Sequence, residues 1–244
     1  MADLRIKYMG LELKNPVVAG ASNMVTNTDN LKRLEKAGAA AIVYKSLFEE
    51  QIQAENLELF ERRTEYEERN AEMITLFPNS KSDLTYPEEH LWNLKRAKEA
   101  VSIPVIASLN AVRSETWIEY AKKLNLYTGP EKMDEGKDDV EKKHIRTVKD
   151  VKSAVGIPVS VKLSPYYTNP LKLIAEMDKA GADGFVLFNR LFQPDIDIHA
   201  EKHTFPYSLS HPEDMRLPMR FAGLLNGNIK ASICASSGIF KGDD

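Results

Sequence analysis

Two short patterns recur in this chain, and together they constrain its fold more than any other feature of the sequence. Lys-Ala-Gly-Ala occurs at 36–39 and at 179–182, each time between a stretch of helix formers and an apolar run. A glycine just after a helix can adopt a positive φ and end the helix. Ile-Pro-Val occurs at 103–105 and 157–159, where proline begins a further apolar run without removing a ladder hydrogen bond. The repeats therefore predict helix-to-strand junctions.

The apolar runs show little alternation, which is typical of strands buried on both faces of a parallel sheet. Strands and helices alternating at this density predict an α/β fold, and seven or eight units favour a TIM (β/α)8 barrel over an open sheet. The predicted strands are Pro16–Ala19, Ala40–Tyr44, Val105–Ser108, a strand near Leu124–Tyr127, Val159–Lys162, Phe185–Phe188 and Ile229–Cys234; the predicted helices are 28–37, 88–101, 114–124, 141–155 and 169–180.

We expect a single domain over residues 1–244, because α/β barrels commonly run to about 250 residues. Residues 4–14 predict a hairpin that turns at Gly10 and covers the bottom of the barrel, and 49–87 form a charged excursion. The excursion is either a solvated helical segment or a lid or subunit-contact arm. The barrel is expected to be incomplete, since 114–124 runs into Asn125 with almost no fourth strand and no eighth βα unit follows.

Charge and cysteine content exclude several classes of function. The net charge of −3, from 33 basic and 36 acidic residues, gives no large basic excess for nucleic acid or a membrane surface. One cysteine, Cys234, excludes a disulfide framework and any CxxC metal or redox site. No apolar run approaches the length of a membrane-spanning helix, and the N-terminus has no signal-peptide core. We therefore expect a soluble cytoplasmic protein, with Cys234 as a small buried core residue.

Polar residues follow nearly every predicted strand, and in a barrel the active site lies at these strand ends. Lys45 and Lys162 directly follow or end apolar runs. Each could be a Schiff-base nucleophile, a charge partner for a phosphate, a partner for the electron-rich edge of a flavin, or a solvated surface group. Paired carboxylates, which glycosidases use, are missing there. His199 and His203 would share a helical face, but no third ligand is apparent, so no metal site is expected.

The strand-end set resembles the dihydroorotate dehydrogenase family, whose members are FMN-binding TIM barrels, and is nearest to the dihydroorotate dehydrogenase-like proteins of bacteria. The resemblance implies FMN at the barrel mouth, a pyrimidine-like substrate stacked on it, hydride transfer to flavin N5 and a residue that removes a proton. The pieces that carry the resemblance span nearly the whole chain and are Asn15-Pro16, Ala21-Ser22, Lys45-Ser46, Asn125-Leu126, Val161-Lys162-Leu163, Asn189, Arg216-Leu217-Pro218 and Ser236-Ser237-Gly238-Ile239.

Residue roles follow from the same resemblance. Ser237 and Gly238 would offer backbone N–H groups to the phosphate, and Lys45, which also counts as a catalytic residue, would contact the flavin ring with Lys162. The remaining expected flavin contacts are Ala21, Ser22, Ser46, Asn110 and Asn125, and the expected substrate contacts are Asn79, Asn125 and Asn189. Thr128 stands where the family has its catalytic base, a cysteine or serine, and Pro130 stands in place of a substrate-binding asparagine.

The leading functional hypothesis is an FMN-dependent oxidoreductase that acts on a CH–CH bond of a small dihydropyrimidine-like substrate, as in pyrimidine biosynthesis. Because a threonine hydroxyl is a poor base without an activating partner, the alternative is a catalytically impaired member that binds a ligand or a partner chain. A flavin-free lyase with Lys45 or Lys162 as Schiff-base lysine is the third hypothesis. Besides the substrate, the partner left open is a second copy in a homodimer or an electron-transfer protein.

Overall fold

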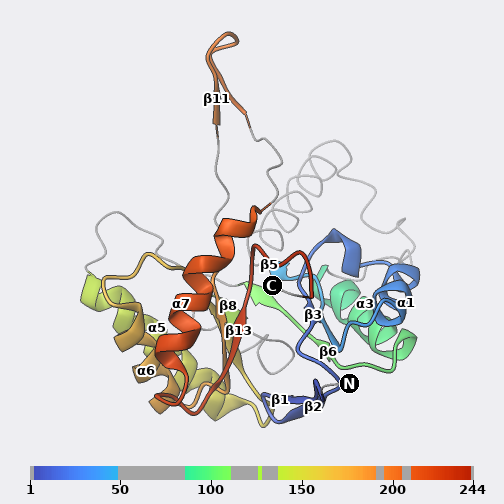
Figure 1. Cartoon of the computed structure of the whole chain (residues 1–244), viewed down its shortest axis with the longest axis horizontal. Helices are drawn as coiled ribbons and strands as arrows, with labels where there is room; N and C mark the ends of the chain where they lie inside the picture. Colours follow the sequence, from blue (N-terminus) through green and yellow to red (C-terminus); the bar gives the residue numbers. More distant parts are fainter. Residues whose placement is uncertain are drawn as a thin grey trace, which may run out of the picture. The chain divides into compact units, whose positions relative to one another are not determined.

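The structure is a computed structural model, and it divides the chain into two compact units. The first comprises Met1–Lys7 and Glu12–Leu126, and the second comprises Tyr8–Leu11 and Tyr127–Asp244. Each unit has parallel strands and helices of its own, so the fold is mixed α/β, as the alternating pattern predicts (Figure 1). The residues that the structure describes are 3–48, 86–110, 126–127, 137–190, 195–204 and 210–242.

Both Lys-Ala-Gly-Ala repeats form the predicted junctions. The helices α1 (Thr28–Lys36) and α6 (Pro170–Lys179) end at these repeats, one residue earlier than predicted. Gly38 and Gly181 have φ values of 111° and 106°, a region that glycine adopts without the steric penalty of a side chain. A buried strand follows each glycine, and the prediction is confirmed at both places.

The N-terminal residues form the predicted hairpin. β1 (Ile6–Tyr8) pairs with β2 (Leu11–Leu13), and the turn between them consists of Met9 and Gly10. Both turn residues have positive φ, 50° and 81°, as in the tight two-residue turns that suit the twist of paired strands.

The first unit is built on a parallel sheet in the order β3-β4-β6. Its strands are β3 (Val18–Ala19), β4 (Ala41–Val43) and β6 (Val105–Ile106), all shorter than predicted. At β3 the reason is local: the Val17 N–H donates to Asn15 Oδ1 at 2.9 Å, and the strand begins at Val18, two residues later than predicted. The helices α1 and α3 (Tyr86–Ala100) pack against each other beside this sheet.

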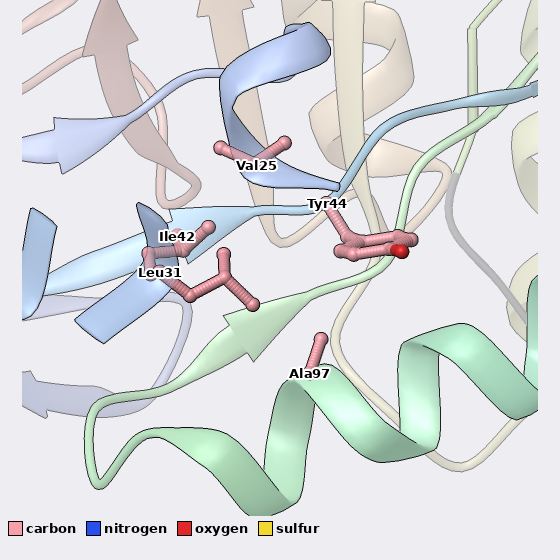
Figure 2. Packing of buried hydrophobic residues seen from close by; sticks show 5 residues of the cluster. All are labelled: Val25, Leu31, Ile42, Tyr44 and Ala97. Atoms are coloured by element: carbon pink, nitrogen blue, oxygen red, sulfur yellow. The ribbon is translucent and has the colours of Figure 1, made fainter. Parts of the chain in front are cut away.

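A cluster of buried apolar residues holds these elements together (Figure 2). Leu31 of α1 and Ile42 of β4 are fully buried, and Ala97 of α3 and Tyr44 lie against them. Val25 closes the cluster from the 3-10 helix η1 (Asn23–Val25). Because burying each large aliphatic side chain contributes about 1.5–3 kcal/mol, this cluster fixes α1 and α3 on the sheet.

A β-bulge interrupts the sheet just past β4. Val43 pairs with Ile106, whereas Leu47, in β5 (Leu47–Phe48), pairs with Leu109, in β7 (Leu109–Asn110). The first strand therefore carries one residue more than the second between these two pairs. Bulges of this kind bend a strand and redirect side chains, and they are frequent beside active sites. β4 and β6 lie within the predicted strands Ala40–Tyr44 and Val105–Ser108, whereas β5 and β7 lie beyond the predicted ends of those strands.

The second unit contains a sheet in the order β13-β10-β9-β8. β10 (Gly184–Leu187) pairs in parallel with both β9 (Ser160–Leu163) and β13 (Ser232–Ala235), and β8 is Leu126–Tyr127. The strand predicted at Ile229–Cys234 starts at Ser232, because the backbone N–H of Ala231 donates to Asp178 Oδ1 at 2.8 Å. The N–H of Val159 likewise donates to Asp183 Oδ2 at 2.7 Å, so β9 begins one residue later than predicted.

The helices α5 (Lys137–Ala154), α6 and α7 (Arg216–Leu225) accompany this sheet. α5 begins four residues before the predicted helix 141–155. Its buried positions Val140, His144, Thr147, Val148 and Val151 follow the helical repeat, so the charged appearance of this segment belongs to its outer face. α7 follows the 3-10 helix η2 (Pro212–Met215) and packs on β10 and β13.

A second hairpin was not predicted from the sequence. β11 (Asp195–Asp197) pairs with β12 (Lys202–Thr204) in an antiparallel ladder. His199 lies in its turn and His203 in β12, so the premise that these histidines could share a helical face is wrong. In the part of the chain that the structure describes, no group of side chains could hold a metal ion.

Candidate functional site

Strand alternation in the second unit divides its sheet into two unlike faces. Val161, Leu163, Phe185 and Leu187 are completely buried and share one face. The opposite face, called here the Lys162 face, carries two rows of residues in register: Ser160, Gly184 and Ser232 in the first, and Lys162, Val186 and Cys234 in the second. The only charged side chain of these three strands thus lies on the face opposite their fully buried side chains.

Lys162 is partly buried, and its ammonium makes no hydrogen bond or ion pair with any residue that the structure describes. Burial lowers the pKa of Lys162, and the neighbouring Cys234 opposes that change. A partly desolvated ammonium without a carboxylate partner is unfavourable by itself. An anionic or electron-rich ligand on this face would remove that penalty.

The N-terminal hairpin closes the Lys162 face on the side where the strands begin. The Met9 N–H donates to Ser232 Oγ at 2.9 Å, and the Tyr8 hydroxyl lies 3.4 Å from Ser160 Oγ. The Met9 side chain lies against Gly184, where a Cβ would come within 2.9 Å of Met9 Cγ and Sδ. Burial, with a contribution from Cys234, raises the pKa of Tyr8 to about 12. Tyr8 and Met9 thus cover the row Ser160, Gly184 and Ser232 of the Lys162 face.

The carboxyl ends of β9, β10 and β13 stay hydrogen-bonded beyond the strands themselves. The Asn189 N–H donates to the Leu163 carbonyl at 2.7 Å, and the Ser236 N–H donates to the Leu187 carbonyl at 2.7 Å. The Ser236 hydroxyl donates to the Phe188 carbonyl at 2.8 Å. These bonds fix the backbone of Asn189, a predicted substrate contact, directly beside the end of β9.

The turn Ser237-Gly238 is a tightly packed part of the structure. Both residues have positive φ, 79° and 73°. Gly238 is buried, and a Cβ there would meet the backbone N of Met215 and come within 2.9 Å of the His211 carbonyl oxygen. The close approach of the segment before α7 is therefore one physical reason for glycine at this position, independent of any phosphate.

In the first unit, Lys45 and Ser46 lie in the bulge between β4 and β5. The N–H groups of Tyr44 and Leu47 donate to carbonyls of the neighbouring strand at 2.8 and 3.0 Å, so the backbone on both sides of Lys45 is fixed. Ser46 Oγ lies 2.7 Å from Ser108 Oγ. Lys45 is partly buried, and Asn110 ends β7. Lys45, Ser46 and Asn110 thus gather at the carboxyl end of this sheet.

Ala21 and Ser22 follow β3 in the same unit, and both are exposed. The Ser22 hydroxyl caps η1, where it accepts a hydrogen bond from the Met24 N–H at 3.3 Å. The Ser22 side chain therefore stabilises the start of η1.

His90 is a buried residue for which the sequence predicts no role. Its Nε2 has no hydrogen-bond partner among the residues that the structure describes, and its ring meets the Tyr44 ring edge-on at 5.5 Å. Burial, with the charge of Lys45, lowers the pKa of His90 to about 4, so the imidazole is neutral at pH 7. The sequence held a signal that His90 is buried: the helical spacing of His90, Leu94 and Ala97 puts all three residues on one face of α3.

Three predicted site residues, Asn79, Asn125 and Thr128, lie outside the described residues. Lys45 belongs to the first unit and Lys162 to the second, so the position of each lysine is described within its own unit. No helix among the described residues is long and apolar enough to cross a membrane.

Comparison with known proteins finds similar chains of one description. The catalytic subunit of dihydroorotate dehydrogenase B (NAD(+)) from Methanocaldococcus jannaschii is 24% identical over 261 residues, which cover 99% of this chain and 81% of that protein. The corresponding subunit from Methanocella arvoryzae is 30% identical over 78% of this chain and 63% of its own length. The subunit from Thermoplasma acidophilum is 26% identical, over 82% and 66%. The last two matches thus span less than two thirds of the relatives. No family model matches the chain.

Proposed function

The relatives support membership of this chain in a dihydroorotate dehydrogenase-like family, and from that premise we propose that it is an FMN-dependent oxidoreductase. The proposed reaction transfers a hydride from a CH–CH bond of a small dihydropyrimidine-like substrate to the flavin. The relatives are named for the oxidation of dihydroorotate, a compound of this class.

The observation that carries the proposal is the Lys162 ammonium, partly desolvated and without a carboxylate partner among the described residues. FMN, when bound, supplies a ring that accepts a hydride and becomes electron-rich at its pyrimidine edge. An ammonium next to that edge stabilises the added negative charge. Lys162 fits this role because it lies one row beyond the residues that the hairpin covers, toward the carboxyl ends of the strands, where barrels have their active sites.

The other proposed flavin contacts are distributed over both units. Lys45 and Ser46 would hold the ring from the bulge, and the N–H groups of Ser237 and Gly238 would hold the phosphate. Further contacts are proposed for Ala21, Ser22, Asn110 and Asn125. Since the two units each contribute parallel strands followed by polar residues, we propose that they are parts of one barrel. The shortened fourth strand stays a prediction.

Amide side chains are suited to the proposed substrate. A pyrimidine presents carbonyl acceptors and N–H donors side by side, and an asparagine amide offers the complementary pair. We propose Asn79, Asn125 and Asn189 for this role, and Thr128 as the residue above the substrate. A threonine hydroxyl accepts a proton only with a neighbouring base, so the proton-removing step is expected to be slow in this chain.

The experiment is a titration of the purified protein with FMN, followed by anaerobic mixing with dihydroorotate. We expect quenching of FMN fluorescence on binding and bleaching of the flavin absorbance by the substrate. Lys162→Met should weaken FMN binding about 10- to 100-fold, the range for a hydrogen bond to a charged group. Lys179→Met, at the exposed end of α6, is the matched control and should bind as the wild type does. Absence of FMN binding by the wild-type protein refutes the proposal.

A second candidate function is favoured by one observation, the lowered pKa of Lys162. A desolvated lysine supplies more free amine and can form a Schiff base with a carbonyl substrate. Borohydride trapping with carbonyl compounds would label Lys162 in such a lyase. Label that is lost in Lys162→Met favours the lyase, and absence of label rejects it.

The relatives are catalytic subunits by name, so they work with further subunits. We propose an electron-transfer partner for this chain as well, with a homodimer as the alternative. Mass measurement in solution and NAD+ reduction with and without added partner subunit separate the two. Reduction of NAD+ by the isolated chain at full rate would contradict the need for an electron-transfer partner.

A further inference from the structure

Two residues of the bulge in the first unit, Lys45 and Ser46, lie opposite a single residue of the neighbouring strand, Ser108. Beyond the bulge, the Leu47 N–H donates to the Ser108 carbonyl at 3.0 Å, and Leu47 pairs with the residue after Ser108. Before the bulge, the Tyr44 N–H donates at 2.8 Å to the carbonyl two residues before Ser108, so Tyr44 pairs with the residue just before it. Ser108 is therefore the residue that faces both members of the bulge.

The bulge brings the side chains of Lys45 and Ser46 to the same face of the sheet. Alternate residues of a strand share a face, so Lys45 lies on the face of Val43. Val43 pairs with Ile106, and Ser108 follows Ile106 by two residues on that same face. The Ser46 hydroxyl lies there too, because Ser46 Oγ is 2.7 Å from Ser108 Oγ. Lys45 and the hydrogen-bonded serine pair, all partly buried, therefore share one face at the carboxyl end of this sheet.

The serine pair attaches the bulge itself to the neighbouring strand. On either side of the bulge, Tyr44 and Leu47 are buried, and their N–H groups fix the backbone by hydrogen bonds. Within the described parts of the chain, the N–H groups of Lys45 and Ser46 make no backbone hydrogen bond. The bond between the two hydroxyls therefore restrains the one stretch that the backbone ladder does not hold.

We propose that Ser108 is a positioning residue that acts on the bound ligand through Lys45. By holding Ser46, the Ser108 hydroxyl fixes the backbone from which the Lys45 side chain extends, and so limits the positions of its ammonium. A lysine loses rotamer freedom when it makes a defined contact, and a fixed backbone reduces the freedom that remains to be lost on binding. This inference rests on the proposed function, in which Lys45 holds the flavin ring.

The first test needs no cofactor and measures amide hydrogen exchange of the full chain, residue by residue, by NMR. Ser108→Ala removes the hydroxyl but keeps the carbonyl that the Leu47 N–H uses. We expect the Leu47 amide to exchange about 2- to 10-fold faster, the range for one lost neutral hydrogen bond. The Ile42 amide, which bonds to the Pro104 carbonyl before the bulge, should keep the wild-type rate. Unchanged exchange at Leu47, or an equal rise at Ile42, overturns the inference.

The same measurement tests the hydroxyl pair itself. Ser46→Ala breaks the same bond from the other strand, so it should raise the exchange of Leu47 as much as Ser108→Ala does. The double variant should exchange no faster than either single variant, because both changes remove one interaction. Ser108→Thr keeps a hydroxyl and should restore the wild-type rate. Single effects that add up in the double variant contradict the proposed pair.

The second test measures FMN affinity of Ser108→Ala in the wild-type and in a Lys45→Met background. We expect a loss of about 2- to 10-fold in the first and a clearly smaller loss in the second, where no ammonium is left to position. Ser108→Thr should recover the wild-type affinity. Ser102→Ala is the matched control: it loses a serine hydroxyl that bonds to Glu35 ahead of β6, and it should bind FMN as the wild type does. An equal loss in both backgrounds refutes the action through Lys45.

The failure of this inference and the failure of the proposed function give different results. No FMN binding by the wild type, with faster Leu47 exchange in Ser108→Ala, refutes the function and leaves the hold of Ser108 on the bulge standing. FMN binding that depends on Lys45, with the same affinity in the wild type and Ser108→Ala, refutes the role of Ser108 and leaves the function standing.

Discussion

Gly184 is the position where the packing of the N-terminal hairpin on the second sheet can be measured most directly. A Cβ there would lie 2.9 Å from Met9 Cγ and Sδ and 3.1 Å from Ser160 Oγ, all closer than van der Waals contact allows. We therefore expect Gly184→Ala to push the Met9 side chain off the sheet, and with it the hairpin that closes the Lys162 face.

The magnitude follows from two opposing effects. Overpacking costs about 1–3 kcal/mol, and the lower half of that range applies because the blocking atoms belong to a flexible methionine. Alanine also restricts the unfolded chain and returns about 0.4–1 kcal/mol. The free energy of unfolding should thus fall by about 1 kcal/mol. In a Met9→Ala background the blocking atoms are absent, and the same substitution should be neutral or slightly stabilising.

Urea unfolding followed by circular dichroism measures these changes through the transition midpoint. Gly223→Ala is the matched control, because Gly223 is exposed on α7 and a Cβ there meets nothing within 4 Å. It should stabilise the protein by about 0.5–1 kcal/mol. If Gly184→Ala is as stable as the wild type, or costs as much in the Met9→Ala background, the packing argument is refuted.

Three further variants test other parts of the structure. Folding lowers the pKa of His90 to about 4, so below pH 6.5 the unfolded chain binds a proton that the folded protein does not. The free energy of unfolding should therefore fall by up to about 3 kcal/mol between pH 7 and pH 4. His90→Phe should remove this loss, as measured by urea midpoints at both pH values. Gly238→Ala should lower the melting temperature clearly, since its Cβ would meet the Met215 backbone at a positive φ, and an unchanged melting temperature contradicts that packing. Asn27→Ala should cost about 1 kcal/mol, because Asn27 Oδ1 caps α1 by accepting the Asp29 N–H at 2.8 Å; Asn27→Ser, which keeps a capping oxygen, should cost less.

The features that the sequence predicted well are those determined by neighbouring residues. The glycines at 38 and 181 end their helices through their own conformational freedom, and the hairpin turn depends only on Met9 and Gly10. Strand limits were predicted less well, because they depend on distant residues. Asp178 and Asp183 take the N–H groups that would otherwise begin β13 and β9, and neither carboxylate stands near those strands in the sequence.

The same distinction holds for the candidate site. Lys162 was found because a lysine within an apolar run is conspicuous in any sequence. Its neighbour Cys234 was taken for a core residue, since their proximity depends on the register of two strands on either side of β10. The bulge at Lys45 could not be predicted either, because it exists only relative to the partner strand.

The hairpin contacts have a consequence for the time course of synthesis. Met9 bonds to Ser232, 223 residues further along the chain, and Tyr8 lies against Ser160, 152 residues further. At a translation rate of about 5–20 residues per second, Met9 waits roughly 11 to 45 s before its partner leaves the ribosome. Met9 is therefore made long before the residue to which it bonds, and its backbone N–H stays without this partner during that time.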